Sequence, residues 1–460
     1  MDSSIKIKSR IERSYGIARA RRDIPAVKER RNALKKLFAA LKKYEMPILS
    51  VLSEELGRSA FDAYTFELLP LARCFKYLIK KLPSLAAERK AKGKWFTFPA
   101  RYFVVQEPYG EVFINASWNY PFLLAFEPLA GALAAGNRAV LKLSMRIPRS
   151  TSLIKRIIEE VFTDDEVICV TDELTGEEII SCGCDYIFFT GSRSEAEPIC
   201  RAAAEKVIPV TLELGGKNPC IIGAGANFDV AARRIVWGKF TNAGQTCIAP
   251  DYILVEKGAR DAFVHALVAQ IRRKYSDAPL SFSGCGKVVD TTAYERLNVM
   301  SKSGRLLCGG EKNPGALCIS PTVVDQLNDD DPLLTQEVFG PLLGVIEYEN
   351  TEDLIGILSR NPDPLAVYCF GAGKECTEAV RRRVRSGAFC ENDCLLQFSN
   401  ENVPFGGIGT SGMGAYHGKA TFSTFSFSRI IMRQSRWFDL NFRYSAGKWK
   451  EKFAGWLFRR

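Results

Sequence analysis

The spacing of apolar residues near the N-terminus predicts an amphipathic helix over residues 26–44. Apolar side chains recur there at helical intervals between turns rich in Lys and Arg: Val27, Leu34, Leu37, Phe38 and Leu41. Side chains at intervals of three, four and seven positions share one face of a helix. We therefore expect a helix with one apolar, buried face and one basic, exposed face.

From about residue 102 the pattern changes to short apolar and β-branched runs separated by longer helical patterns. The runs are YFVV (102–105), VFI (112–114), AVL (139–141), VICV (167–170), YIFF (186–189) and IPVTL (208–212), and a second series includes YILV (252–255) and LAVYCF (365–370). Buried strands that alternate with helices indicate parallel sheets covered on both faces. We expect two α/β lobes that divide near Gly215 and Gly216.

The composition places the chain among ordinary globular proteins. Of 460 residues, 47% are hydrophobic and 25% are charged, which fits two or three domains. No eighteen-residue apolar run occurs, and no hydrophobic stretch precedes the first N-terminal charges, so neither a transmembrane helix nor a signal peptide is predicted. We expect a cytoplasmic protein.

The cysteine and histidine content narrows the chemistry. Fourteen cysteines show no disulfide framework and no zinc-binding spacing, which indicates reduced thiols. Only His265 and His417 occur, too few for most metal or histidine-based acid–base sites. We expect no metal site, and we expect carboxylates to handle proton transfer.

Both ends of the chain are basic. Residues 1–50 contain fourteen Lys and Arg against five Asp and Glu, and residues 436–460 contain seven against two. The basic residues at the two ends would either bind an anionic surface or, as the favoured interpretation, form the solvent-exposed faces of terminal helices. We expect no nucleic-acid partner.

Four short stretches combine reactive side chains with turns. Cys247 follows a Gly-containing turn, which suits a nucleophile as well as an inert buried thiol. Glu213 ends an apolar strand, where desolvation favours a general base but a lysine partner is an equal alternative. Asn119 is either an oxyanion donor or a turn residue before Pro121. The strand–Gly191–Ser192–helix turn is a weak signal for a phosphate site.

Taken together, these stretches resemble the aldehyde dehydrogenase superfamily, in particular its class 3 branch of fatty and aromatic aldehyde dehydrogenases. The matching motifs, in order, are WNYPF (118–122), FTGS (189–192), LELGGK (212–217), GQTCIAP (244–250), EVFGP (337–341) and PFGGIG (404–409). The segment TSGMGAYHGK (410–419) is especially similar to class 3. The resemblance extends from about residue 10 to the C-terminal tail.

The resemblance implies a role for each catalytic candidate. Cys247 would attack the aldehyde to give a thiohemiacetal, and Asn119 with the Cys247 N–H would stabilise the oxyanion. After hydride transfer to the nicotinamide, Glu213 would activate the water that hydrolyses the thioester.

The same resemblance implies an NAD or NADP cofactor and the residues that contact it. Glu337 would bind the nicotinamide ribose, with Phe339 packing beside that end of the cofactor. Lys142 would contact the adenosine ribose, and Gly191 and Ser192 would lie near the pyrophosphate.

The resemblance also implies the domain organisation. We expect an aldehyde dehydrogenase-like α/β fold with a Rossmann-like NAD(P)-binding domain (1–80 and 102–210) and a catalytic domain (211–406). A bridging or oligomerisation segment would combine residues 81–101 and 407–432, and residues 433–460 would form a basic amphipathic tail. Class 3 relatives are typically homodimers, so a homodimer is expected.

Two departures from the family pattern concern the cofactor. The family usually reads Lys-Pro-Ser-Glu where this chain reads KLSM (142–145), which removes a carboxylate that would repel a 2′-phosphate; with Arg146 adjacent, NADP should be accepted at least as well as NAD. In SRSEAE (192–197), Glu195 replaces a small apolar residue under the cofactor. A carboxylate beside a pyrophosphate lowers affinity, so we expect weak cofactor binding.

The C-terminal tail places Trp449, Phe453, Trp456 and Leu457 on one face of a helix with Lys and Arg around it. Such a helix suits an anionic membrane surface, which would give peripheral membrane contact. The favoured alternative is a helix docked on the protein, beside the substrate entrance or on a dimer partner.

The leading hypothesis is NAD(P)-dependent oxidation of hydrophobic, medium- or long-chain or aromatic aldehydes to acids. One alternative is a coenzyme A-acylating aldehyde dehydrogenase, which has less need of Glu213 as a water-activating base. A second is a cofactor-impaired binding protein of the same fold, suggested by the altered 192–197 turn. A Cys–His hydrolase fits least, because neither histidine belongs to a known constellation.

Overall fold

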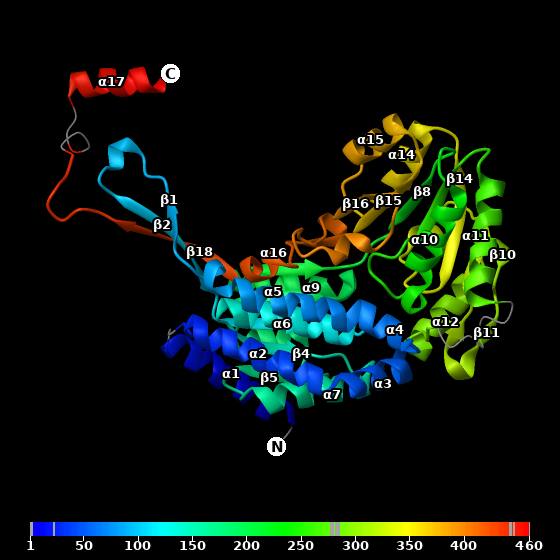
Figure 1. The fold of residues 1–460 in the computed structure, drawn as a ribbon, viewed down its shortest axis with the longest axis horizontal. Coiled ribbons are helices and arrows are strands. Elements are labelled where there is room, and N and C mark those ends of the chain that lie inside the picture. The colour runs from blue at the N-terminus through cyan, green and yellow to red at the C-terminus, as the bar shows by residue number, and fades with distance from the viewer. Residues whose placement is uncertain are drawn as a thin grey trace.

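The computed structural model describes residues 3–21, 24–276, 280, 286–440, 444 and 447–459. Two α/β lobes stand side by side, and an arm extends from the first lobe away from both (Figure 1). The parallel-sheet architecture expected from the alternating strand and helix pattern is confirmed.

The first lobe is built on a six-stranded sheet. Its strand order is β17 (Gly412–Met413), β7 (Val210–Glu213), β6 (Tyr186–Thr190), β3 (Glu111–Asn115), β4 (Arg138–Lys142) and β5 (Val167–Val170). All neighbours are parallel except β17, which runs antiparallel to β7. The inner strands β6, β3 and β4 are buried on both faces, which is why they read as continuous apolar runs.

Helices cover both faces of this sheet. One face carries α1 (Ser3–Arg21), α8 (Gly176–Cys182) and α9 (Arg193–Lys206). The other carries α6 (Pro121–Ala135) and α7 (Pro148–Val161), backed by α2 (Val27–Lys43), α3 (Glu45–Leu56), α4 (Ala60–Ala63), a π-helical turn (Tyr64–Leu68) and α5 (Leu69–Leu85). The predicted N-terminal helix is α2, whose buried residues include Leu34, Leu37 and Leu41.

The second lobe is built on a seven-stranded sheet. Its order is β10 (Arg305–Cys308), β13 (Thr322–Asp325), β14 (Leu342–Tyr348), β9 (Tyr252–Glu256), β8 (Pro219–Ile222), β15 (Ala366–Phe370) and β16 (Ala388–Glu391). Only the β10–β13 pair is antiparallel. Its helices are α10 (Phe228–Phe240), α11 (Arg260–Tyr275), α12 (Thr291–Met300), α13 (Pro332–Thr335), α14 (Thr351–Ser359) and α15 (Lys374–Arg383), and β11 (Lys312–Asn313) pairs with β12 (Cys318–Ile319).

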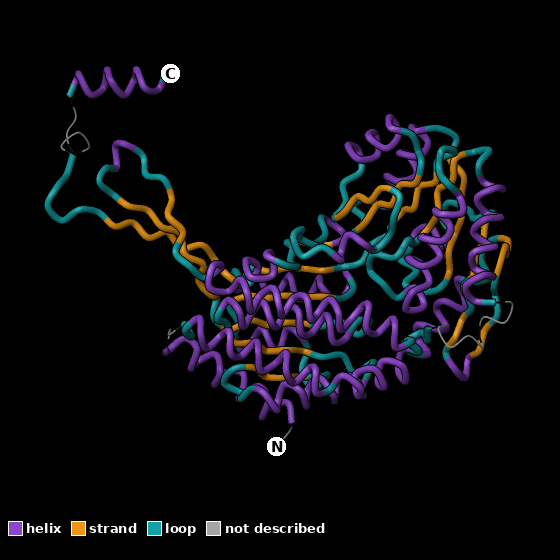
Figure 2. Tube along the Cα trace, in the orientation of Figure 1, coloured by secondary structure: helices purple, strands orange, loops and turns teal. Residues whose placement is uncertain are grey.

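The arm is a three-stranded antiparallel sheet of β1 (Arg89–Ala91), β2 (Arg101–Pro108) and β18 (Ser426–Arg433) (Figure 2). The expectation that YFVV (102–105) lies in a parallel sheet covered on both faces is therefore wrong. These residues form part of β2, which is only half-buried and pairs with β1 and β18. An apolar run alone does not distinguish the two sheet types.

The segment 407–432 takes part in three different structures. Strand β17 joins the first lobe, α16 (Lys419–Thr424) packs on α6, and β18 enters the arm. The contacts of β17 and α16 with the first lobe cross the expected boundary between the bridging segment and the NAD(P)-binding domain. The expected domain boundaries stay a prediction.

The C-terminal helix α17 (Lys448–Phe458) lies beyond the end of the arm (Figure 1). Its Phe453 ring lies 6.3 Å from that of Trp95, in the 3-10 turn Trp95–Thr97 of the arm. The tail thus contacts the arm, which was not among the positions considered from the sequence.

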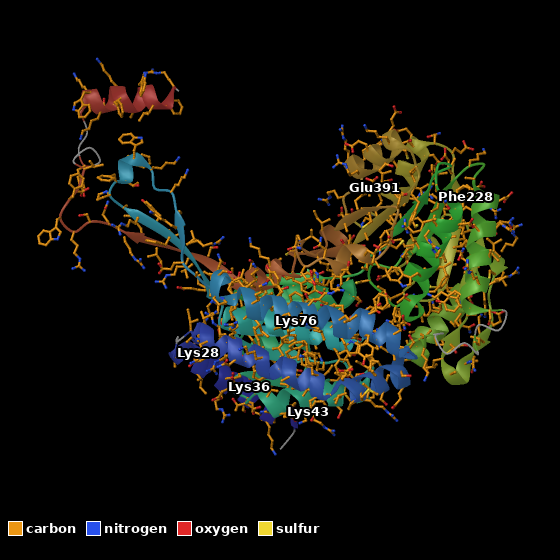
Figure 3. All side chains as sticks on the ribbon, viewed as in Figure 1. Lys28, Lys36, Lys43, Lys76, Phe228 and Glu391 are labelled. Atoms are coloured by element: carbon orange, nitrogen blue, oxygen red, sulfur yellow. The ribbon has the colours of Figure 1, made fainter. Side chains whose placement is uncertain are left out.

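The basic N-terminal region presents an exposed helix face. Lys28, Lys36 and Lys43 of α2 and Lys76 of α5 lie on the exposed surface of the first lobe (Figure 3), and Lys43 pairs with Glu160 at 2.6 Å. This placement agrees with the solvated-face interpretation of the N-terminal charge. Across the described residues, no helix combines the length and apolarity needed to cross a membrane.

Candidate active site

A cavity of about 530 Å³ lies where the two lobes meet, within the size range of small-molecule sites. Its wall includes seven of the eight residues predicted for the site: Asn119, Gly191, Ser192, Glu213, Cys247, Glu337 and Phe339. The first four belong to the first lobe, at or after the carboxyl ends of strands β3, β6 and β7, and the last three belong to the second lobe. Ligands of parallel α/β sheets bind at such strand ends.

Cys247 is presented by a strained turn after α10. Asn242 and Ala243 take left-handed backbone angles, and Gly244 follows with φ of 73°. A Cβ on Gly244 would lie 2.2 Å from the carbonyl oxygen of Gly340, so only glycine fits. Strain of this kind costs on the order of 1–3 kcal/mol per residue and marks functional turns.

The Cys247 side chain is half-buried in the cavity wall. Burial, together with the negative charges of Glu337 and Glu213, raises the pKa of its thiol to about 12. The thiol is therefore protonated at neutral pH. Before it attacks, a base must remove its proton, and an approaching cation would make this easier by lowering the pKa of the thiol.

Asn119 is fixed by a buried hydrogen-bond network. Its Nδ2 donates to the main-chain oxygen of Gln245 at 3.1 Å, and its own carbonyl accepts from Asn242 Nδ2 at 3.0 Å and from Arg58. Arg58 in turn forms a fully buried salt bridge with Glu67 at 2.6 Å. An amide nitrogen has two N–H donors, so one remains for a ligand.

Glu213 ends strand β7 and is 4% exposed. Neither of its carboxylate oxygens has a hydrogen-bond partner in the structure. Burial, with the nearby charge of Glu127, holds the pKa of this carboxyl well above its usual value. The expected alternative, pairing with Lys217, does not occur: Lys217 Nζ binds Asp251 at 2.6 Å.

The Gly191–Ser192 turn leads from β6 into α9. Ser192 caps this helix and Glu195 completes a capping box, because Glu195 Oε2 accepts from Ser192 N at 3.0 Å and Ser192 Oγ at 2.7 Å. The carboxylate thus occupies the helix N-terminus at which an anion would bind. Glu195 also lines the cavity.

Glu337 and Phe339 enter the cavity from the other lobe. Glu337 Oε1 accepts from Gly216 N at 3.2 Å, and burial with the charge of Asp251 raises the pKa of Glu337 to about 7. A Cβ on Gly215 would lie 2.1 Å from Glu337 Oε1, so a side chain at this position would displace the Glu337 carboxylate. The Phe339 ring stands edge-on to Trp118 at 5.5 Å.

Lys142 is the one predicted residue outside the cavity wall. Its Nζ donates to Thr171 O at 3.1 Å and lies 3.4 Å from Asp172. Arg146, by contrast, lines the cavity, where its guanidinium stacks 4.6 Å above Trp118 and binds Asp290 at 2.6 Å.

Three contributors were missed by the sequence analysis. Arg296 donates to the carbonyls of Glu337 and Val338 at 3.2 and 2.6 Å, so it holds that loop. Arg58 pairs with Glu67 and donates to the main-chain oxygen of Asn119, so it helps to fix Asn119. No local sequence pattern indicates that Arg296 or Arg58 belongs to the site. Tyr416 lines the cavity beside His417, and its place within TSGMGAYHGK was a usable signal.

The fold and the cavity define a two-lobed α/β enzyme with a cysteine, an amide and a buried carboxylate around one pocket. More particularly, the chain belongs to the aldehyde dehydrogenase family, whose model matches residues 7–431. NAD(P)-dependent oxidation of aldehydes is the general reaction of this family.

Individual relatives cover nearly the whole chain. It is 36% identical to 4,4'-diaponeurosporen-aldehyde dehydrogenase of Staphylococcus aureus, over 94% of each chain. It is 34% identical to aldehyde dehydrogenase family 3 member A2 of Rattus norvegicus, over 86% of this chain and 82% of the relative. The solved substrate-bound structure of Staphylococcus aureus AldH superposes with a TM-score of 0.95 at 34% identity, covering 98% of this chain and 99% of the other.

Proposed function

We propose that this protein oxidises hydrophobic aldehydes to carboxylic acids through a covalent intermediate on Cys247. The observation that carries the proposal is the convergence of Cys247, Asn119 and Glu213 on one cavity from two separate lobes. Each side chain has the chemistry that one step requires.

In the first step the Cys247 sulfur bonds to the aldehyde carbon, the carbonyl π bond opens onto its oxygen, and the thiol proton passes to a base at the cavity. The free N–H of Asn119 and the main-chain N–H of Cys247 would donate to the oxygen that becomes negative. A nicotinamide held by Glu337 and Phe339 would supply the acceptor for the hydride that leaves this carbon, and Cys247 would then carry the acyl group as a thioester.

In the second step water cleaves the thioester. Glu213 suits the base, because a buried carboxylate without hydrogen bonds is a stronger base than a solvated one. Its presence argues against a coenzyme A-acylating enzyme, which passes the acyl group to a thiol rather than to water.

The cofactor fits the nicotinamide end of the cavity better than the pyrophosphate end. Glu337 presents carboxylate oxygens suited to ribose hydroxyls, and Phe339 offers an apolar surface beside them. At α9, however, Glu195 already accepts the Ser192 N–H. We expect NAD or NADP to bind there with a Kd weakened by that carboxylate.

We propose that NADP is accepted at least as well as NAD. Position 145 holds an exposed methionine rather than a carboxylate, so no charge at that position repels a 2′-phosphate. Lys142 adds a cation near the same strand end, although Asp172 partly neutralises it. Comparing kcat/KM for the two cofactors tests this, and a strong NAD preference would refute it.

The apolar wall supports a hydrophobic substrate. Aromatic and aliphatic side chains line the cavity near Cys247: Phe66, Trp118, Tyr120, Leu123, Leu124, Ile248, Leu395, Phe398, Phe405 and Tyr416. Burial of each additional methylene contributes about 0.8 kcal/mol. Medium- and long-chain or aromatic aldehydes should therefore bind better than short ones.

A substrate panel run with each cofactor tests the function. Short, medium, long-chain and aromatic aldehydes are compared by NAD(P)H formation, with Cys247→Ala as the blank. If Cys247 can be labelled stoichiometrically but no aldehyde gives NAD(P)H, the protein is instead the cofactor-impaired binding protein that the Glu195 contact would favour.

We also propose a homodimer in which the arm packs on a second copy. Large apolar side chains of the arm and the segment after it are solvent-exposed, including Phe98 at 62%, Ile430 at 72% and Trp437 at 97%. Exposed apolar surface of this extent marks an interaction site. A mass of one chain by light scattering would exclude the dimer, and Ile430→Glu should weaken it.

The alternative occupant of this surface is a membrane. Helix α17 carries Lys450 and Lys452 together with exposed Phe458, and Arg459 directly follows it, which suits an anionic bilayer. Co-sedimentation with anionic vesicles is compared for the full chain and a chain ending at residue 446. Equal sedimentation of the two would end the membrane proposal.

A further inference from the structure

A buried cluster of three charges contacts the loop that carries Glu337 and Phe339. Asp251 directly precedes β9, Lys217 lies between β7 and β8, and Lys239 lies on α10, and all three side chains are buried. The Nζ atoms of Lys217 and Lys239 lie 2.6 and 3.6 Å from the Asp251 carboxylate. The proposed reaction steps use none of these three groups.

The Asp251 carboxylate is hydrogen-bonded to the main chain of that loop. Both of its oxygens accept from the N–H of Val338 at 3.2 Å. Lys217 Nζ, which binds Asp251, also donates to the carbonyl of Leu333 at 2.6 Å. Arg296 donates to the carbonyl of Val338 at 2.6 Å. The N–H and the C=O of Val338 are therefore both held by buried or partly buried charged side chains.

The loop has a backbone conformation that needs such support. Phe339 has a φ of 46°, which residues other than glycine rarely adopt. A conformation of this kind persists only where the surrounding structure holds it. Val338 lies between Glu337 and Phe339 and is fully buried. The bonds at Val338 thus fix the directions in which its two neighbours enter the cavity.

Folding stability alone gives little reason for the cluster. Burial lowers the pKa of Lys239 to about 8, so this lysine still carries its charge at neutral pH and two cations share one anion. Replacing buried ion pairs with well-packed apolar side chains is often neutral or stabilising. The cluster is better explained by the main-chain group that Asp251 holds.

We propose that Asp251, supported by Lys217, is a positioning residue for the cofactor, because it fixes the 337–339 loop in the conformation that receives the nicotinamide ribose. The inference rests on the proposed function and adds residues to its cofactor site. Neither Asp251 nor Lys217 belongs to the cavity wall, so both act through Val338.

The nucleophile is held by different bonds. Asn218 Nδ2 donates to the main-chain oxygens of Cys247 and Ala249 at 2.7 and 3.1 Å. Asn218 Oδ1 accepts from the N–H of Ala366 at 2.9 Å. None of these three bonds involves the Asp251 carboxylate. A change at Asp251 should therefore weaken cofactor binding and leave the nucleophile in place.

The test compares Asp251→Asn with Asp325→Asn in a fluorescence or calorimetric titration of cofactor. Asp325 is also buried in the second lobe and also pairs with two cations, Arg260 and Arg305, but it is not part of the cavity wall. Each variant takes a buried anion away from two cations, so both should lower the melting temperature. Only Asp251→Asn should raise the Kd for NAD(P), about tenfold if the held loop conformation falls to about a tenth of the population.

A second measurement needs no cofactor. Hydrogen–deuterium exchange of the peptide that covers residues 337–339 should be faster in free Asp251→Asn, because the Val338 N–H loses its charged acceptor. Exchange of this peptide in Asp325→Asn should match that of the unmodified protein. Iodoacetamide should alkylate Cys247 in both variants within about twofold of the unmodified rate, since the surroundings of the thiol are unchanged. Peptide mass spectrometry measures both quantities.

Three results would each overturn the inference. The first is an unchanged cofactor Kd in Asp251→Asn, or an equal rise in Asp325→Asn. The second is unchanged exchange of the 337–339 peptide in Asp251→Asn. The third is a Cys247 alkylation rate that falls together with the cofactor affinity, because the whole site would then be disturbed.

A second variant serves if Asp251→Asn does not fold. Lys217→Met leaves Asp251 paired with Lys239, and the same titration and exchange measurements then decide. The titration of the unmodified protein reports on the proposed function separately. If it binds neither NAD nor NADP, the proposed function fails and the inference fails with it. If it binds and the variants bind equally well, the inference alone is refuted.

Discussion

Glu195 provides the sharpest test of the cofactor site. Its carboxylate lies at the N-terminus of α9, held by Ser192 N and Oγ at 3.0 and 2.7 Å, where a pyrophosphate would seek the same backbone donor. Glu195→Gln keeps the length and the oxygen acceptor of the side chain. The capping box therefore survives while the charge is removed.

The expected gain follows from Coulomb's law. Two like charges about 4 Å apart in a medium close to water repel each other by about 1 kcal/mol, and Glu195 is exposed to such a medium. Removing the Glu195 charge should lower the Kd for NAD(P) about fivefold. The gain should shrink at high salt, since exposed charges are screened.

The assay is a fluorescence or calorimetric titration of cofactor, with Glu197→Gln as the control. Glu197 lies on the same helix, loses the same charge, and bonds Arg193 and Arg201 at 3.4 and 3.8 Å away from the cavity wall. Equal Kd values for Glu195→Gln and the unmodified protein would refute the reasoning. So would an equal gain in Glu197→Gln, because a general charge effect would then suffice.

Further predictions concern the catalytic residues and their support. Cys247→Ala should abolish aldehyde-dependent NAD(P)H formation while cofactor still binds; any residual aldehyde-dependent rate comparable to the unmodified protein rules out Cys247 as nucleophile. Because burial and nearby carboxylates raise the pKa of Cys247 to about 12, its thiolate fraction grows tenfold per pH unit below that value, so kcat/KM should rise with pH through the neutral range; a flat profile contradicts this. Burial raises the pKa of Glu213 in the folded protein above its unfolded value, so the contribution of this carboxyl to folding stability is fully present below the unfolded pKa and is lost as the pH rises through the folded pKa. The melting-temperature advantage of Glu213→Gln over the unmodified protein should therefore be larger at pH 8 than at pH 5. Because Glu213 is the proposed base, the same variant should have a kcat at least about 100-fold lower. Arg58→Met should destabilise the fold by about 3 kcal/mol and lower kcat, because it leaves Glu67 buried without its cation; the double variant with Glu67→Gln should recover part of that melting temperature.

The local features of the site were predictable from the sequence. Cys247 follows a turn that contains Gly244, and Glu213 is the last residue of an apolar strand. Both patterns depend only on neighbouring residues. The supporting network was not predictable, because Arg58 reaches Asn119 across 61 positions of the chain. No local periodicity encodes a contact of that range.

Glu195 and the YFVV run show two different limits. The sequence indicates the conflict between Glu195 and a pyrophosphate, and the S-x-x-E spacing of Ser192 and Glu195 also predicts the capping box that the structure contains. The run at 102–105 reads as a buried strand, and only its partners, β1 and β18, place it in the arm. Tertiary context decides such a strand.

The division of the site between the lobes has a mechanical consequence. Glu213 and Asn119 move with the six-stranded sheet, whereas Cys247 and Glu337 move with the seven-stranded sheet. A few degrees of hinge rotation would separate the base from the nucleophile without breaking either sheet. The ion pair between Arg146, which lines the cavity, and Asp290 joins the two lobes and would oppose such a rotation.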